Sequence, residues 1–253
     1  MTASSEDCCP APAPAPPDRT EGSSRATLAA SAGSIISAFL ASAIHDMKNS
    51  ISVLMCFLDD NITKLDPEAQ REAAPMLYEV QRVNDNLLQM LAIYKVGNQF
   101  YPFDLAENSI AEFVREVAEQ NKSLLDYLGI TLETDCDEEL YWYFDHELVA
   151  GVISHALNNA SHYTKDKLRL VAKEVDGELV IRVEDNGGGY PGNVLDAGDA
   201  VNKGVNFASG STGLGLYFSA MVARLHQNRG RTGSMQLENG GAYGGGCFIL
   251  RLP

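Results

Sequence analysis

Two glycine-bearing segments late in the chain carry residue types that could bind a nucleotide. The first runs from Asp185 to Gly189 (DNGGG) and the second from Ser211 to Leu216 (STGLGL). Glycines let backbone N–H groups approach a phosphate or a base, because no side chain stands in the way. A carboxylate beside them can accept a hydrogen bond from an exocyclic amine, and Gly187 and Gly189 leave room for the base. The two segments therefore predict a nucleotide site, with a simple β-turn as the alternative for DNGGG.

The phosphate end of this site is expected where a helix begins. The predicted helix from Gly213 to about Gln227 would present its first N–H groups and its positive dipole end to a triphosphate. Four residues open it: Thr212, Gly213, Leu214 and Gly215. A lid is expected between the two glycine segments, and Lys203 is its best cation for the phosphates. A solvated loop lysine is an equal alternative.

Upstream residues supply a metal ligand and a phosphoryl acceptor. The amide oxygen of Asn159 is a neutral ligand suited to Mg²⁺ that bridges triphosphate oxygens. His45 follows the apolar position Ile44, so its imidazole is expected to face outward as a nucleophile. Asp46 can hydrogen-bond the other ring nitrogen, and Asn49 shares the face of His45 one turn later. The alternative is that this segment is only the polar face of an amphipathic helix.

Two heptad patterns predict the element that carries His45. One seam consists of Leu40, Ile44, Met47, Ile51, Leu54 and Leu58, and the other of Met76, Val80, Val83, Leu87, Met90 and Tyr94. Both step by four and three residues, Pro67 marks the turn between them, and Gly97 with Asn98 closes the second helix. We expect an antiparallel helical hairpin over 27–98. Because two helices leave each seam half exposed, we also expect a homodimer that forms a four-helix bundle.

The remainder of the chain predicts a second domain of mixed structure. Residues 1–26 are rich in Pro, Ala and Ser, so a disordered tail is expected there, and 99–105 is a linker. Within 106–253 the patterns predict helices over 110–128, 146–163 and 213–227, and strands at 130–134, 140–144, 167–175, 178–185, 234–238 and 246–252. Tight turns such as Asp176-Gly177 join consecutive strands. The expected fold is α+β, with an antiparallel or mixed sheet covered by helices on one face.

The composition and charge of the chain restrict the classes of binding partner that we expect. The chain has 253 residues and a formal net charge of −15, with 34 acidic side chains against 19 basic ones. Nucleic acid is disfavoured as a partner because its phosphates are bound by clustered Lys and Arg. Without an apolar run of about 18 residues, we expect no membrane span and a soluble, cytoplasmic protein. The five cysteines are odd in number and lack metal-binding spacing, which favours reduced thiols; Cys8 and Cys9 could bind metal or be oxidised.

Four ordered motifs carry a resemblance to a known family. They are HDMKN at 45–49, HALNNASHYT at 155–164, DNGGG at 185–189 and GSTGLGL at 210–216. Together they resemble the phosphoacceptor, asparagine and two glycine boxes of two-component sensor histidine kinases, over nearly everything from about residue 28 onward. The resemblance implies a dimerisation and histidine-phosphotransfer hairpin followed by an α/β-sandwich ATP-binding domain of the type shared with gyrase and Hsp90.

The resemblance also implies roles for individual residues. His45 would take the γ-phosphoryl group from Mg-ATP and pass it to an aspartate on a receiver domain of a separate response regulator. Asn49 occupies the position that orients a water for dephosphorylation of that regulator. His162 stands at a common phosphate contact and Tyr163 could pack on the nucleotide, although ordinary packing explains either residue nearly as well.

The chain departs from the family pattern at two positions. The family usually has an asparagine where this chain has His155, and a glycine where it has Ser211. These departures favour an alternative, a non-kinase phosphotransfer or scaffold protein with the kinase architecture. Another ATPase, or a serine kinase of the same ATP-binding class, is a third interpretation. The signal would come from an upstream partner protein, from the tail or from regulated abundance.

Overall fold

The computed structural model describes residues 42–43, 46–98, 100–202 and 211–253. Contacts divide the chain into two units, 1–43 and 44–253. Almost all of the first unit, together with His45 and Lys203, lies outside the described residues, and so does the predicted tail. The architecture below is that of the second unit. The predicted boundaries between tail, hairpin, linker and ATP-binding domain stay predictions.

The helical hairpin forms where the heptads predict it. Residues 46–62 are helical, and after a turn the long helix α2 spans Pro67–Gly97. Asp66 caps α2, because its side chain accepts from the backbone N–H groups of Glu68 and Ala69, while Pro67 takes a first-turn position that needs no donor. At the other end, the cap residue Asn98 donates its backbone N–H to Tyr94. The predicted turn and C-terminus are confirmed.

The two faces of α2 have different surroundings. Ala74, Leu77 and Tyr78 are buried against residues of the following domain. The seam positions Met76, Val83 and Met90 stay 63%, 46% and 46% exposed. The other seam positions, Val80, Leu87 and Tyr94, are partly buried. One chain therefore buries a face that the heptad pattern did not single out and leaves half of its predicted seam exposed. The homodimer stays a prediction, and this exposed seam supports it.

The second domain is built on a five-stranded sheet in the order β2-β4-β5-β9-β8. The strands, in chain order, are β2 Thr131–Cys136, β4 Lys167–Val175, β5 Glu178–Asp185, β8 Ser234–Gly240 and β9 Gly245–Leu252. Only β2 and β4 run parallel, and the other neighbours are antiparallel. The predicted α+β fold with a mixed, mostly antiparallel sheet is confirmed.

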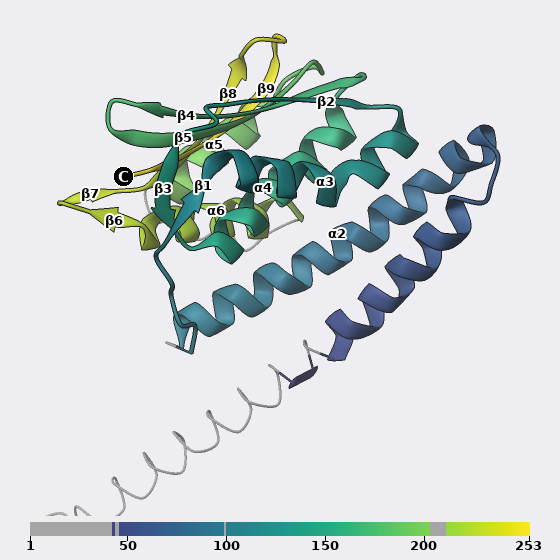
Figure 1. Ribbon diagram of the computed structural model, residues 1–253, viewed down its shortest axis with the longest axis horizontal. Helices are drawn as coiled ribbons and strands as arrows, with labels where there is room; N and C mark the ends of the chain where they lie inside the picture. The colour runs from purple at the N-terminus through teal and green to yellow at the C-terminus, as the bar shows by residue number, and fades with distance from the viewer. Residues whose placement is uncertain (1–41, 44–45, 99, 203–210) are drawn as a thin grey trace, which may run out of the picture. The chain divides into compact units, whose positions relative to one another are not determined.

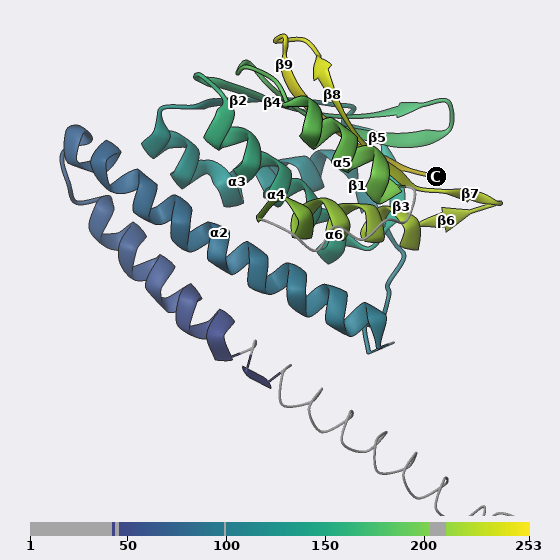
Figure 2. The same cartoon turned by 180° about the vertical axis from the view of Figure 1, so that it is seen from behind.

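Three helices cover one face of this sheet: α3 Ile110–Leu128, α4 His146–Tyr163 and α6 Ser211–Leu225 (Figures 1 and 2). Their apolar faces meet the sheet in a core where Phe113, Ile153 and Leu250 are fully buried. Asp145 caps α4 by accepting from the backbone N–H of Leu148, as its sequence position predicts. α2 packs against α3, α4 and α6 on their other side.

Some elements were not expected. Strand β1, Ala106–Ser109, was not predicted, and it pairs with the predicted strand β3, Tyr141–Phe144. The short strands β6, Gln227–Asn228, and β7, Arg231–Thr232, pair with each other and were also not predicted.

Helix α5, Gly192–Asn202, was not predicted, and it lies in the stretch expected to form the lid. The lid stays a prediction. The glycines of α5 argued against a helix, but α5 packs against β8, where Gly198 lies close to Leu237. Tertiary contact outweighed the low helix propensity.

A search of the described helices finds none long and apolar enough to cross a membrane. Cytoplasmic location stays a prediction. Three of the cysteines, Cys56, Cys136 and Cys247, are free thiols, in agreement with the expectation of reduced cysteines. Cys8 and Cys9 lie outside the described residues.

Candidate nucleotide site

The DNGGG segment forms a turn packed against the end of α4. Asp185 is the last residue of β5, is 4% exposed, and accepts a 2.7 Å hydrogen bond at Oδ1 from the backbone N–H of Gly187. A Cβ atom at Gly187 would collide with the carbonyl oxygen of Tyr163. Glycine is therefore required here for close approach of two backbones, which brings Asp185 to the helix that carries Asn159.

Asn186 holds this turn in place, a role that the sequence analysis missed. Its Oδ1 accepts from the hydroxyl of Thr164 at 2.8 Å and from the backbone N–H groups of Lys165, Asp166 and Lys167 at 3.0–3.2 Å. One side chain thus fixes the loop between α4 and β4 against the end of β5. An asparagine directly after the acidic residue was the available signal, because Asn side chains bind nearby backbone groups.

Glycines surround the carboxylate of Asp185 on the side of β9. A Cβ atom at Gly245 or Gly246 would collide with Asp185. Gly189 has a φ of 78° and lies against Asn239, whose Oδ1 accepts from Tyr190 N–H. Burial, together with the nearby charge of Asp185, raises the pKa of the Tyr190 hydroxyl. Small residues therefore frame a buried carboxylate at the end of the sheet.

Helix α4 presents Asn159 with a defined amide orientation. Nδ2 of Asn159 lies 2.8 Å from Nε2 of His155, one turn earlier. Burial lowers the pKa of His155 to about 4, so the ring is neutral at neutral pH. An amide nitrogen can only donate, so Nε2 must be the acceptor and the ring proton sits on Nδ1. This contact leaves Oδ1 of Asn159 as the atom that can bind a cation.

His155 also positions the start of α6. A Cβ atom at Gly215 would collide with the imidazole of His155. The glycine thus lets the first turn of α6, with Gly213 and Leu214, approach α4 closely. Thr212 lies within α6 by its backbone. The structure therefore brings Gly215 of the second glycine segment and Gly187 of the DNGGG turn against the C-terminal half of α4, which carries Asn159.

His162, another predicted ligand on α4, contacts the hairpin, and so does Asn158. His162 stacks on Tyr78 of α2, with ring centroids 5.2 Å apart and planes 17° apart, and meets the edge of Tyr163 at 4.9 Å. Nδ2 of Asn158 donates to Oδ2 of Asp85 at 2.8 Å. Asn158 thus faces α2, because consecutive residues of a helix point about 100° apart. Nucleotide contact by His162 or Tyr163 stays a prediction.

The acceptor end of the site is described only in part. Asp46 and Asn49 lie at exposed positions of the helix 46–62, both engaged in interactions. His45 and Lys203 lie outside the described residues, so their geometry carries no argument. Their roles stay predictions.

The donor set fits Mg²⁺ bound mainly through a nucleotide. Within the described residues, no group of three or more His, Cys, Asp or Glu side chains could hold a metal ion. Asn159 offers one neutral oxygen instead. Mg²⁺ keeps several waters and is commonly bound through one or two protein ligands plus substrate phosphates, so a single amide oxygen is compatible with it.

Comparison with known proteins defines the class. Residues 144–253 match the family described as "Histidine kinase-, DNA gyrase B-, and HSP90-like ATPase". This region contains the asparagine helix, the DNGGG turn and α6. The region is thus similar to ATPase-type domains of that class, which bind ATP.

The relatives also cover the hairpin. The chain is 24% identical over 224 residues to the sensor protein SrrB of Staphylococcus aureus strains N315 and NCTC 8325, spanning 85% of this chain and 37% of each relative. It therefore spans little more than a third of the length of these relatives. The resemblance to two-component sensor histidine kinases is confirmed.

Solved structures show the same fold. The histidine kinase AdeS of Acinetobacter baumannii aligns with a TM-score of 0.52 at 18% identity, over 82% of this chain and 96% of that one. The catalytic domain of histidine kinase ThkA aligns with a TM-score of 0.50 at 19% identity, over 59% of this chain and 97% of that one.

Proposed function

We propose that this chain is an ATP-dependent protein-histidine kinase that phosphorylates His45 and passes the phosphoryl group to an aspartate of a response regulator. The observation that carries the proposal is the convergence of the DNGGG turn and the start of α6 on the C-terminal half of α4, which carries Asn159. The backbone approach at Gly187 and the contact of His155 with Gly215 hold the three together.

Each element of this site has a role in the proposed reaction. Asp185 would accept from the adenine amino group, and the first N–H groups of α6 would bind phosphate oxygens. Asn159 would hold Mg²⁺ through Oδ1, and bound Mg²⁺ would neutralise charge on the phosphates. A ring nitrogen of His45 would attack the γ-phosphorus, so that an N–P bond forms while the P–O bond to ADP breaks. Asp46 would take the hydrogen bond from the other ring nitrogen.

The phosphohistidine would then donate its phosphoryl group to a receiver aspartate. Asn49, one turn after His45, would orient water for the reverse task of dephosphorylating the regulator. A homodimer in which the exposed seams of two hairpins pack together would complete the phosphotransfer bundle. An upstream partner protein is one source of the signal.

The alternative, a scaffold without kinase activity, rests on the departures at His155 and Ser211. In the structure a neutral His155 orients the amide of Asn159, which removes much of the argument that the departure damages the metal site.

Labelling with γ-³²P-ATP and Mg²⁺ tests the proposal. We expect acid-labile label on the intact chain and none on His45→Gln. Asp185→Asn should weaken ATP binding roughly 10- to 100-fold, because a charge-assisted hydrogen bond contributes about 1.5–3 kcal/mol. The matched control is Asp126→Asn at an exposed position of α3, which should leave binding unchanged.

The outcomes separate the three interpretations. ATP binding without label would favour the scaffold protein. Acid-stable label, or ATP turnover that survives His45→Gln, would favour another ATPase or a serine kinase.

A further inference from the structure

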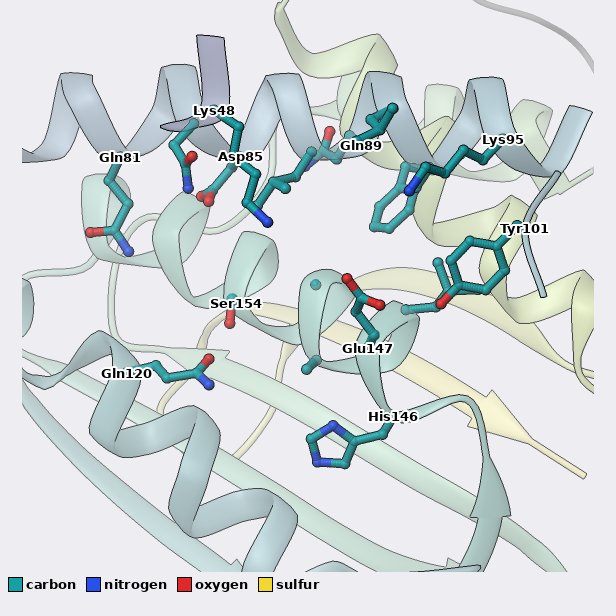
Figure 3. Close-up of a pocket in the computed structure, with 18 of the residues that line it drawn as sticks. Lys48, Gln81, Asp85, Gln89, Lys95, Tyr101, Gln120, His146, Glu147 and Ser154 are labelled. Atoms are coloured by element: carbon teal, nitrogen blue, oxygen red, sulfur yellow. The ribbon is translucent and has the colours of Figure 1, made fainter. Parts of the chain in front are cut away.

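A cavity lies between the helices, away from the predicted nucleotide ligands. Its volume is about 430 Å³, within the range of small-molecule sites. Figure 3 shows Asp85, Gln89 and Lys95 of α2 facing Glu147 and Ser154 of α4 across it. The hairpin and the ATP-binding domain thus both contribute walls, and the lining described includes none of the predicted nucleotide ligands.

Gln89 gives this cavity an unmet hydrogen-bonding requirement. The residue is 2% exposed, yet neither Nε2 nor Oε1 has a hydrogen-bond partner among the described residues. The Oδ1 atom of Asn84, which also lines the cavity, is likewise without a partner in the described part of the chain. Burying a polar group without a hydrogen-bond partner costs free energy. A polar ligand in the cavity would satisfy both side chains.

The charges around the cavity have both signs. Asp85 and Glu147 provide carboxylates, and Lys48 and Lys95 provide ammonium groups (Figure 3). A third carboxylate in the lining, that of Glu116, lies 3.2 Å from Nε2 of His146. Burial raises the pKa of Asp85 to about 6, and only the hydrogen bond from Asn158 opposes that shift. A positively charged group placed beside this carboxylate would stabilise its ionised form.

Apolar side chains complete the lining. Leu88 and Ala92 of α2, Leu148 of α4 and Phe218 of α6 contribute to the wall. A ligand for this cavity therefore needs a cationic group, an anionic group and a part that tolerates apolar contact. A dicarboxylate would leave Asp85 and Glu147 uncompensated, and a diamine would do the same to the two lysines.

We propose that this cavity binds a small zwitterion of the amino-acid type. Its ammonium group meets Asp85 and Oε1 of Gln89, and its carboxylate meets the lysines. Because α2 and α4 both form walls, the bound ligand stabilises the contact between the hairpin and the ATP-binding domain. This site requires neither ATP nor His45, so the proposed ligand binding and the proposed kinase activity can be tested independently.

Isothermal titration calorimetry on the full chain without nucleotide tests the proposal. The probes are the twenty common amino acids and glycylglycine, each tested singly, with glutarate and putrescine as controls that carry one sign of charge. We expect at least one zwitterion to bind and neither control to match it. Failure of every zwitterion, or equal binding of glutarate or putrescine, overturns the proposal.

Two variants locate the binding. Gln89→Met removes the unpaired amide at similar volume, and Asp85→Asn removes the carboxylate charge while keeping an acceptor for Asn158. Each should lower the affinity for the zwitterion at least tenfold, whereas Gln236→Met, at an exposed position of β8, should not change it. Binding that survives both cavity variants places the ligand elsewhere and overturns the proposal. If Gln89→Met fails to fold, Asp85→Asn decides alone.

Discussion

His155 orients the side-chain amide of Asn159 by accepting a hydrogen bond from it, and only a neutral imidazole can accept this bond. A protonated ring would donate from both nitrogens and could not accept from Nδ2 of Asn159. Burial keeps the pKa of His155 at about 4, well below neutral pH. The same ring fills the space that Gly215 leaves open. His155, which departs from the family pattern, therefore fits its neighbours Asn159 and Gly215.

Asp85 predicts a pH-dependent effect on stability. Its pKa is raised from 3.8 to about 6 in the folded chain. A raised carboxyl pKa contributes stability that is complete below the unfolded pKa and is lost as pH rises through the folded pKa. Asp85→Asn should therefore match the native chain at pH 4. Above pH 4 the variant should become more stable than the native chain. This difference in the free energy of unfolding should grow by about 1.4 kcal/mol per pH unit and level off after pH 6.

Urea denaturation at pH 4, 5, 6 and 7 measures this difference. His155 has the opposite dependence, since its lowered pKa makes stability fall as pH drops from about 6.5 to 4. It is present in both proteins, so it cancels from the comparison. The exposed variant Asp196→Asn is the control. A stability difference that does not change with pH would contradict the raised pKa of Asp85.

At the scale of elements, the approach of α6 to α4 depends on one glycine. Gly215→Ala places a methyl group against the ring of His155 and should lower the free energy of unfolding by about 1–3 kcal/mol. ATP binding should weaken with it, because the first turn of α6 would be displaced. Thermal or urea denaturation and ATP titration measure the two effects.

The chain offers a matched control for this substitution. A Cβ atom at Gly188, in the other glycine segment, would meet no described atom within 4 Å. Gly188→Ala should therefore change stability by less than about 0.5 kcal/mol. Adding His155→Ala to Gly215→Ala should restore part of the loss, since the colliding ring is gone. Equal effects at positions 188 and 215 would argue against close packing of α6 on α4.

Local patterns predicted most elements because their signals are short-range. Asp145 was a predictable cap, and Asp176-Gly177 was a predictable hairpin turn. Helix α5 and strand β1 were missed. α5 contains glycines that disfavour a helix in isolation, and β1 has no apolar alternation, so packing against β8 and pairing with β3 decided them.

At the scale of the whole molecule, the exposed seam of α2 predicts self-association. Val83→Glu places a charge in the middle of the stripe formed with Met76 and Met90 and should convert a dimer into monomers. Light scattering after size exclusion measures the mass. Arg71→Glu adds the same side chain about 120° away on α2 and should leave the dimer intact. Monomeric native chain, or a dimer in both variants, would contradict the predicted bundle.

The sequence by itself determined the two glycine segments, the heptads and the order of the elements, because each depends on residues that are close together in the chain. Only the tertiary structure decided what those elements face. The contact of Asn158 with Asp85 joins residues 73 positions apart, and the stacking of His162 on Tyr78 likewise connects α4 with α2. No local pattern encodes such pairs, since they depend on how separately folded helices pack. For the same reason Gln89, an ordinary polar residue in the sequence, becomes a buried and unpaired amide in the fold.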